Sequence, residues 1–406
     1  MTILQTGVAR TLRSPVTWAV NGLGLYVLLM YGITYYAVST AAPRVATGFG
    51  VPVSAIFALL TASLLLTAFL APFFGRWTDR IGAASVLTIG ALVRSAALAA
   101  MALAPDYWIF AAAFVVVQIA GQLTEYDAAF AAAVDVAGER SRVAMSQITL
   151  WGGLASTAFW PATAWLLDVM SWRSTFLVYA ALMLATCLPI ALLLRRLRRQ
   201  GATSRTAAPA APADPAPSIR RPPPLALVAV AFALGGIAYN LPVLMLPVLE
   251  GLGLGVAAVA VGMLFGPSQT AGRFVDMVVG TRAQATTVAL VAAATVALAL
   301  LLLLLAGGGV WAGLVFAVLF GAGAGVAYVT RGSVVLQLYG AGGYAGRLGR
   351  LSSVRLVVGA ATPFVLSLIL ERFGAWHVVG FCALAALLSV VCFAWLARAA
   401  TVRAFT

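Results

Sequence analysis

The segment Gly75-Arg76-Trp77-Thr78-Asp79-Arg80-Ile81-Gly82 is a short charged loop between two apolar runs, residues 53–74 and 83–104. A helix needs about 20 apolar residues to cross the roughly 30 Å hydrocarbon core of a bilayer, and each run is long enough. Similar windows recur on both sides of the loop and predict twelve membrane spans. These windows are residues 18–42, 53–74, 83–104, 107–131, 143–167, 174–194, 225–249, 256–279, 284–305, 310–338, 348–370 and 376–397.

Composition supports the same conclusion, because 63% of the 406 residues are hydrophobic and only 9% are charged. A chain of that kind cannot fold as one water-soluble core with a polar shell. The apolar windows lack period-two alternation, which favours helices over a β-barrel. We therefore predict an all-α integral membrane protein with twelve transmembrane helices in two six-helix, pseudo-symmetric halves.

The basic residues are sorted by membrane side. All 25 are arginine, and most lie in the connections that follow even-numbered spans or near the two termini. The positive-inside rule then places both termini in the cytoplasm, and an even number of spans agrees with termini on one side. The formal charge of +14 is thus explained by the lipid bilayer, and nucleic acid is not an expected partner. We expect a multi-pass protein of a cell membrane, the inner membrane of a bacterium.

One polar segment divides the chain. Residues 195–224 begin with Arg-Arg-Leu-Arg-Arg and continue as an Ala/Pro/Ser stretch that cannot bury apolar surface. Such a composition predicts a flexible cytoplasmic linker. It separates an N-terminal half, residues 1–194, from a C-terminal half, residues 225–406.

The two halves are related in sequence. Gly32-Ile33-Thr34-Tyr35-Tyr36 corresponds to Gly236-Ile237-Ala238-Tyr239-Asn240, and Gly75-Arg76-Trp77-Thr78-Asp79 to Gly272-Arg273-Phe274-Val275-Asp276. The matches occur in the same order, which indicates a duplicated six-helix unit. Parallel repeats of this kind are one known way to build a transporter.

The charged loop carries a recognisable signature, Gly-x-x-x-Asp-Arg-x-Gly, matched by Gly75, Asp79, Arg80 and Gly82. The chain therefore resembles the major facilitator superfamily over essentially its full length, although Ala84 and Ser85 replace basic residues that usually follow. The resemblance implies a transporter and not an enzyme, with no cofactor and no metal. It also implies that Asp79 caps the N-terminus of the eleventh helix when the protein faces outward, which would make this loop a conformational lock.

Charged residues inside the first-half spans are candidates for proton coupling, because each costs several kcal/mol in hydrocarbon unless it is paired or hydrated. Arg94 and Glu125 lie at similar depths, about 16 Å from the inner end of their spans at 1.5 Å per residue. Gln118, Gln122 and Glu125 form one polar stripe on a continuous helix, and Asp127 lies on another face. We expect Asp127 to pair with Arg94 and Glu125 to carry the proton. The alternative is one structural cluster of all three charges.

The second half carries an excess of positive charge. Arg273, Arg331 and Arg355 fall inside predicted spans, with Asp276 as the acid nearby and a further candidate for proton coupling. A guanidinium suits a carboxylate because its planar fork donates two parallel hydrogen bonds. The segment Phe274–Met277 also resembles the eighth helix of monocarboxylate and oxalate-type porters. The alternatives are that Arg273 pairs with Asp276 and that the other two arginines extend to the interface.

Aromatic and amide side chains complete the predicted substrate site. Tyr31 and Tyr35 share one face of the first helix, and Tyr239 with Asn240 occupies the repeat-related position. Tyr328 lies on the tenth helix. The resemblance implies a cavity built mainly from helices one, four, seven and ten, to which these residues would belong.

Together these features predict a secondary transporter that moves a small organic anion, a monocarboxylate or dicarboxylate, by alternating access. Its expected partners are the small-molecule substrate, the proton as coupling ion and the lipid bilayer, and it is expected to act as a monomer. The alternative is a proton-driven efflux pump for a drug, a metalloid or another toxic compound. The fourth helix lacks the arginine of the drug exporter signature, since Val115 stands in its place.

Overall fold

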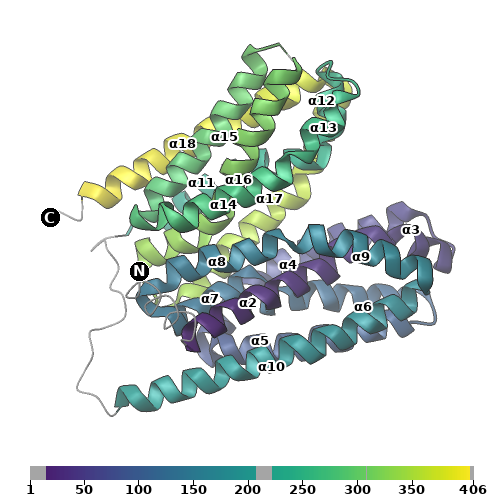
Figure 1. Cartoon of the computed structure of the whole chain (residues 1–406), viewed down its shortest axis with the longest axis vertical. Coiled ribbons are helices and arrows are strands. Elements are labelled where there is room, and N and C mark those ends of the chain that lie inside the picture. The colour runs from purple at the N-terminus through teal and green to yellow at the C-terminus, as the bar shows by residue number, and fades with distance from the viewer. Residues whose placement is uncertain (1–14, 207–221, 308, 403–406) are drawn as a thin grey trace, which may run out of the picture. The chain divides into compact units, whose positions relative to one another are not determined.

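The computed structural model describes residues 15–206, 222–307 and 309–402, and every regular element in these ranges is a helix (Figure 1). Contacts group the chain into two compact units. One unit comprises Met1–Pro215 with Gly343–Gly349, and the other comprises Ala216–Gly342 with Arg350–Thr406. The first turns of α17 (Tyr344–Phe373) therefore belong to the first unit, and the rest of this helix belongs to the second.

The first unit is a bundle in which α5 packs along α10, and α2 along α8 (Figure 1). Its helices are α2 (Pro15–Tyr31), the π-helical turn η1 (Gly32–Tyr36), α3 (Ala37–Phe49), α4 (Val53–Ile81), α5 (Ala83–Leu103), α6 (Tyr107–Ile119), the 3₁₀ turn η2 (Ala120–Leu123), α7 (Tyr126–Ala137), η3 (Gly138–Arg140), α8 (Ser141–Gly153), α9 (Ala155–Val169) and α10 (Trp172–Thr206).

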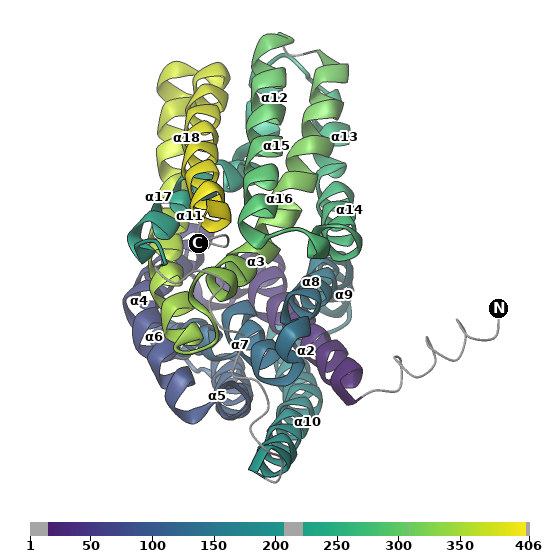
Figure 2. The ribbon, with the colours of Figure 1, turned by 90° about the vertical axis from the view of Figure 1, so that its left-hand side faces the viewer.

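The second unit packs α15 against α16 and α18, and α14 against α16 (Figure 2). Its helices are α11 (Leu225–Tyr239), the 3₁₀ turn η4 (Leu241–Leu244), α12 (Met245–Gly251), α13 (Ala257–Met263), α14 (Phe265–Val278), η5 (Gly280–Arg282), α15 (Ala285–Leu305), α16 (Val310–Tyr339), α17 (Tyr344–Phe373) and α18 (Ala375–Val402).

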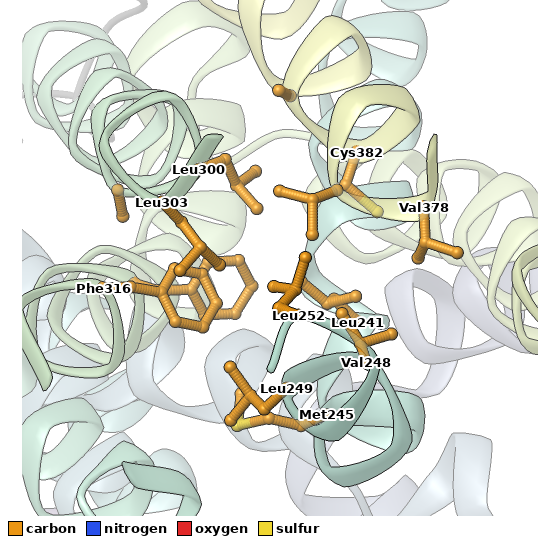
Figure 3. Packing of buried hydrophobic residues seen from close by; sticks show 14 of the residues in the cluster. Leu241, Met245, Val248, Leu249, Leu252, Leu300, Leu303, Phe316, Val378 and Cys382 are labelled. Atoms are coloured by element: carbon orange, nitrogen blue, oxygen red, sulfur yellow. The ribbon is translucent and has the colours of Figure 1, made fainter. Parts of the chain in front are cut away.

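A buried apolar cluster holds η4, α12, α15, α16 and α18 together (Figure 3). Its side chains are apolar, including the sulfur-containing Met245 and Cys382, so close packing stabilises this part of the unit. Its labelled members are Leu241, Met245, Val248, Leu249, Leu252, Leu300, Leu303, Phe316, Val378 and Cys382.

Within the described ranges, ten helical stretches are long and apolar enough to cross a membrane. One of them, Tyr107–Val169, contains 63 residues and covers two predicted spans, residues 107–131 and 143–167, with the segment between them. A further predicted span, residues 256–279, is divided between α13 and α14 and does not qualify as one stretch. The count therefore fits the twelve predicted spans.

Several predicted spans are interrupted inside the membrane region, and a proline lies near two of the breaks. The span over residues 107–131 is interrupted by η2 and by Glu125, which has extended backbone. The span over 225–249 breaks after Asn240, because Pro242 has no N–H for the helical ladder. The span over 256–279 breaks before α14, whose first turn contains Pro267, a position where proline is tolerated.

The predicted linker begins inside a helix. Helix α10 contains 35 residues and continues to Thr206, because Arg, Leu and Gln are good helix formers. Most of the remaining predicted linker, residues 207–221, lies outside the described residues. Pro222, Pro223 and Pro224 precede α11 without helical structure.

Candidate functional site

The charged segment predicted as a loop is helical as far as Ile81 and forms the end of α4, because the helix continues past its apolar residues to Gly82. Its Asp79 binds the first turn of α17. Asp79 Oδ1 accepts a hydrogen bond of 2.9 Å from the Ala345 N–H, and Asp79 Oδ2 accepts one of 2.7 Å from the Gly346 N–H. The first amides of a helix have no preceding turn to bond to, and the helix dipole favours an anion there. Asp79 thus caps a helix more than 260 residues away in sequence.

Glycines allow α4 to approach this turn closely. A methyl group at Gly75 would meet the backbone carbonyl of Ala345, and one at Gly349 would meet the carbonyl of Ala71. Gly346 is restricted as well, because an added Cβ would lie 2.8 Å from Asp79 Oδ2. The first signature residue, Gly75, is therefore required by packing.

The other two signature residues end α4. Gly82 has φ of 85°, a region that favours glycine, and the guanidinium of Arg198 from α10 lies directly against it. Arg198 Nε also lies 3.8 Å from Asp135 Oδ2 at the end of α7. Arg80 is exposed in the last turn of α4, where a positive charge complements the helix dipole.

A buried cluster in the first unit centres on Arg94 of α5, whose side chain is 0% exposed. Arg94 Nη1 donates to Thr124 Oγ1 at 2.6 Å, and Arg94 Nη2 donates to Thr34 Oγ1 at 2.6 Å and to Glu125 Oε1 at 3.1 Å. Gln118 lies nearby, with its Nε2 3.5 Å from the Thr34 carbonyl oxygen. We call Arg94, Thr34, Thr124 and Glu125 the Arg94 cluster.

This geometry corrects the predicted pairing of Arg94. The ion pair is formed with Glu125 and not with Asp127. The continuous polar stripe through Gln118, Gln122 and Glu125 was wrong, because η2 and the extended backbone at Glu125 change the direction of successive side chains. Asp127 instead lines a small cavity, together with Ala71, Gly75, Thr78, Gln122, Ala128, Ala345 and Gly349.

Three tyrosine rings lie next to one another on α2, η1 and α7. The Tyr31 ring lies 6.1 Å from that of Tyr35 and 5.2 Å from that of Tyr126, measured between centroids. Tyr35 is half exposed, whereas Tyr126 is buried against Gly152 of α8. The predicted neighbours Tyr31 and Tyr35 are thus joined by a residue that the sequence analysis did not select.

In the second unit, two arginines contact one ring. The Arg273 guanidinium of α14 lies 5.4 Å from the centroid of the Tyr328 ring on α16. The Arg331 guanidinium, also on α16, lies 5.6 Å from the same centroid. Arg273 Nη2 also donates to Gln269 Oε1 at 3.0 Å. Arg273 is 4% exposed and Arg331 is 9% exposed. We call Arg273, Arg331 and Tyr328 the arginine pair site.

Close helix packing places the arginine pair site. A methyl group at Gly325 would meet the Gln269 carbonyl, and one at Gly272 would meet the Ala322 carbonyl. Small residues at such crossings let two helix backbones approach closely in a membrane. Gly272 of α14 and Gly325 of α16 therefore allow the close approach of these helices that places Arg273 beside Tyr328.

The remaining predicted residues of the second unit have different surroundings. Asp276 is 3% exposed and lies on α14 with Arg273, and its carboxylate leaves no room for a side chain at Gly280. Arg355 of α17 is half-buried, and its side chain forms no hydrogen bond or ion pair with any described residue. Tyr239 packs beside Gly235 of its own helix.

Asn240 has a structural task at the end of α11. Its Nδ2 donates to the Gly236 carbonyl oxygen at 2.7 Å, which satisfies a backbone acceptor where the helix ends. The sequence analysis proposed Asn240 as a substrate ligand, and this hydrogen bond occupies one of its amide donors.

The sequence analysis did not select Thr34, Thr124 or Gln269, which hold the buried arginines. Threonines inside spans normally bond back to their own helix, as Thr67 does to the Ser63 carbonyl oxygen. Nothing in the local sequence distinguishes Thr34 and Thr124 from such residues. Gln269 could have been found, because it lies four residues before Arg273 on the same helix face.

Comparison with known proteins agrees with this architecture. The sequence profile of the Major Facilitator Superfamily matches residues 24–340. A search of curated proteins finds no match. Solved structures share the fold at low sequence identity.

The crystal structure of the human organic anion transporter MFSD10 (TETRAN) aligns with a TM-score of 0.70 and 17% identity, covering 94% of this chain and 100% of that one. The proton:xylose symporter XylE bound to 6-bromo-6-deoxy-D-glucose aligns with a TM-score of 0.68 and 12% identity, covering 93% and 95%. FucP in the outward conformation aligns with a TM-score of 0.59 and 14% identity, covering 94% and 97%.

The profile match spans most of the chain, and the helices and the signature residues agree with it. The chain belongs to the Major Facilitator Superfamily, whose members are transporters.

Proposed function

We propose that the protein is a secondary transporter for a small organic anion, a monocarboxylate or dicarboxylate. The observation that carries the proposal is the arginine pair site, where two buried guanidinium groups contact one tyrosine ring. Buried charge is costly in a membrane and is retained where it serves transport. A carboxylate would accept hydrogen bonds from one or both guanidinium groups and offset their charge.

Other residues of the second unit support an anionic substrate. Asp276 supplies one negative charge beside two positive ones, and Arg355 adds a third guanidinium to the same unit. The Tyr328 hydroxyl and ring provide a polar group and an apolar surface for the body of the substrate. The similarity of Phe274–Met277 to the eighth helix of monocarboxylate and oxalate-type porters agrees with this substrate class.

The names of the structural neighbours describe an organic anion transporter and a proton:xylose symporter. At 17% and 12% identity these similarities establish the fold alone. The substrate class proposed here therefore rests on the buried arginines.

We also propose that transport is coupled to protons through Glu125, with Asp127 and Asp276 as further candidates. Glu125 is 28% exposed, whereas its partner Arg94 is 0% exposed, so a proton can reach the carboxylate while the guanidinium stays buried. Protonation would remove the negative charge from this ion pair and change the preferred arrangement of its helices.

The remaining parts of the proposal follow from the loop and the charge distribution. Asp79 would act as a lock, released when the first turn of α17 leaves it, with Gly75, Arg80 and Gly82 shaping the loop. The protein would act as a monomer in the inner membrane of a bacterium with both termini in the cytoplasm. Tyr31, Tyr35 and Tyr239 would line the path of the substrate.

The test uses proteoliposomes loaded with a pH-sensitive dye. Lactate, pyruvate, succinate and oxalate are added outside one at a time, and internal pH is followed. We expect acidification with at least one of them in the wild type and its loss in Arg273→Ala. Arg282→Gln is the matched control, because Arg282 is an exposed arginine of the same unit in η5.

An equal loss in Arg273→Ala and Arg282→Gln would contradict a binding role for Arg273. A wild type that ignores all four acids but dissipates a proton gradient when a drug or a metalloid oxyanion is added would support the efflux alternative.

A further inference from the structure

The hydrogen bonds of the Arg94 cluster have a fixed direction. Arginine has five N–H donors and no acceptor, so Thr34 Oγ1 and Thr124 Oγ1 must accept from Arg94. Each hydroxyl proton is then available for a backbone carbonyl. Thr34 donates to the Met30 carbonyl oxygen at 2.6 Å, and Thr124 lies 3.2 Å from the Ala120 carbonyl oxygen.

Both threonines lie at irregular turns. Thr34 lies within η1, a π-helical turn in the middle of the helical stretch Pro15–Phe49. Thr124 directly follows η2 and precedes the extended residue Glu125, where the fourth predicted span is broken. Such local departures from α-helix often mark positions that move or serve function. One guanidinium therefore joins the irregular turns of two different helices.

We propose that Thr34 and Thr124 are positioning residues that transmit the charge state of Glu125, through Arg94, to these two turns. The inference rests on the proposed proton coupling at Glu125. With Glu125 charged, Arg94 is held at three points and both turns are fixed. With Glu125 neutral, Arg94 remains buried with two uncharged hydroxyls as its described partners, so its position and both turns relax.

Burial makes this transmission effective. Thr34 is 2% exposed and Thr124 is 0% exposed, so water cannot replace either hydroxyl at its present position. Removing one partner of a buried ion pair leaves a charge that the surroundings must reorganise to satisfy. The backbone at η1 and η2 is the part of the cluster that can reorganise, because neither turn is a continuous α-helix.

Gly121 gives a second indication that the cluster is closely fitted. A Cβ at Gly121 would lie 2.7 Å from Glu125 Oε1 and 3.3 Å from Arg94 Nη2. Glycine at this position therefore lets the carboxylate and the guanidinium meet beside η2.

The test is a double-mutant cycle read by hydrogen–deuterium exchange on the purified full-length protein in lipid nanodiscs at one pH. Glu125→Gln mimics the neutral carboxyl. We expect it to speed amide exchange in residues 30–36 and 120–125 by about tenfold or more, as when a hydrogen bond to a charged group is lost. In the Thr34→Val background, Glu125→Gln should no longer change exchange in residues 30–36, whereas its effect on residues 120–125 should persist.

Thr124→Val provides the reciprocal cycle. In its background, Glu125→Gln should no longer change exchange in residues 120–125 but should still change it in residues 30–36. Thr34→Ser and Thr124→Ser keep the hydroxyl and should restore the response. Thr67→Val is the matched control, because Thr67 is 2% exposed and bonds to its own helix without contacting an arginine. In that background both segments should respond as in the wild type.

The inference would be overturned if the effects of the paired substitutions on exchange rates were additive in both cycles. It would also be overturned if the valine and serine variants at positions 34 and 124 gave the same exchange rates. If valine at position 34 prevents folding, the cycle at Thr124 carries the same test. Gly121→Ala, whose added Cβ would meet Glu125 Oε1 and Arg94 Nη2 while both threonine side chains are kept, should speed exchange in both segments, and wild-type exchange would contradict the inference.

The dye assay with Glu125→Gln separates the inference from the proposed function. Non-additive effects in the double-mutant cycles, together with unchanged proton-driven transport in Glu125→Gln, would show that Glu125 does not couple transport to protons. The proposed transmission from Glu125 to the two turns would still hold. Additive effects in the cycles, together with loss of proton-driven transport in Glu125→Gln, would exclude the transmission to the two turns. Glu125 would keep its proposed role in proton coupling.

Discussion

The two units bury arginine in different ways. In the first, the single guanidinium of Arg94 meets one carboxylate and two hydroxyls, and its surroundings are close to neutral. In the second, Arg273 and Arg331 contact the same tyrosine ring, with Asp276 as the buried acid on α14. The first arrangement pairs one guanidinium with one carboxylate, whereas the second places two guanidinium groups against one ring, which is where the proposed function would bind an anion.

This difference predicts opposite consequences for the same kind of substitution. A partner removed from a balanced buried pair leaves an uncompensated charge, which is strongly destabilising. A cation removed from a site with excess positive charge relieves repulsion between like charges, so stability should be retained while ligand affinity falls.

The largest expected effect is that of Arg94→Met. It leaves Glu125 without its ion-pair partner and should lower the free energy of unfolding by about 3 kcal/mol. Thermal unfolding in detergent measures the change. The control is Arg44→Met, whose ion pair with Asp168 is 2.7 Å long but exposed, and it should cost less than about 1 kcal/mol. Equal losses in the two variants would remove the distinction between buried and exposed pairs.

Arg331→Met tests the other side of the comparison. We expect affinity for the transported carboxylate to fall about 10- to 100-fold, as when a hydrogen bond to a charged group is lost. The melting temperature without substrate should not fall. Isothermal titration with the acid that gives the dye response, alongside thermal unfolding, measures both quantities. A variant that loses stability but keeps affinity would show that Arg331 is structural.

Gly325→Ala should affect the arginine pair site through helix spacing. The added methyl group meets the Gln269 carbonyl, so α14 and α16 must separate, at a cost of about 1 to 3 kcal/mol. Both stability and carboxylate affinity should fall. Gly359→Ala on α17 is the control, since nothing lies within 4 Å of its added Cβ, and it should be neutral or stabilising. Wild-type behaviour of Gly325→Ala would exclude the packing argument.

The smallest expected effect is that of Gln269→Leu. The variant removes the acceptor for Arg273 Nη2, a hydrogen bond of 3.0 Å, and should weaken carboxylate binding by roughly threefold to tenfold. The dissociation constant measures the change, and Thr270→Val on the exposed side of the same helix is the control. An increase in affinity would mean that Gln269 competes with the substrate for Arg273.

The helical breaks show where local sequence reading loses accuracy. Hydropathy over residues 107–131 is continuous, so a window average predicts one uninterrupted span. The chain instead changes direction at η2, and this change moves Glu125 towards Arg94 and Asp127 away towards a cavity beside Gly75. Residues that share one face of an ideal continuous helix point in different directions when the helix is interrupted between them.

The sequence by itself determined the membrane class, the helical content, the charged-loop signature and most of the buried charged residues. These features depend on composition and on local spacing, because each span must satisfy its own backbone in hydrocarbon.

Only the tertiary structure decided which groups meet. Asp79 reaches the amides of Ala345 and Gly346, and Arg94 joins Thr34 of η1 to Thr124 and Glu125 between η2 and α7. Gly82 lies under Arg198 from the end of α10. Hydrogen bonds and ion pairs act over a few ångströms, so their partners depend on how helices distant in sequence pack, and local hydropathy carries no record of that.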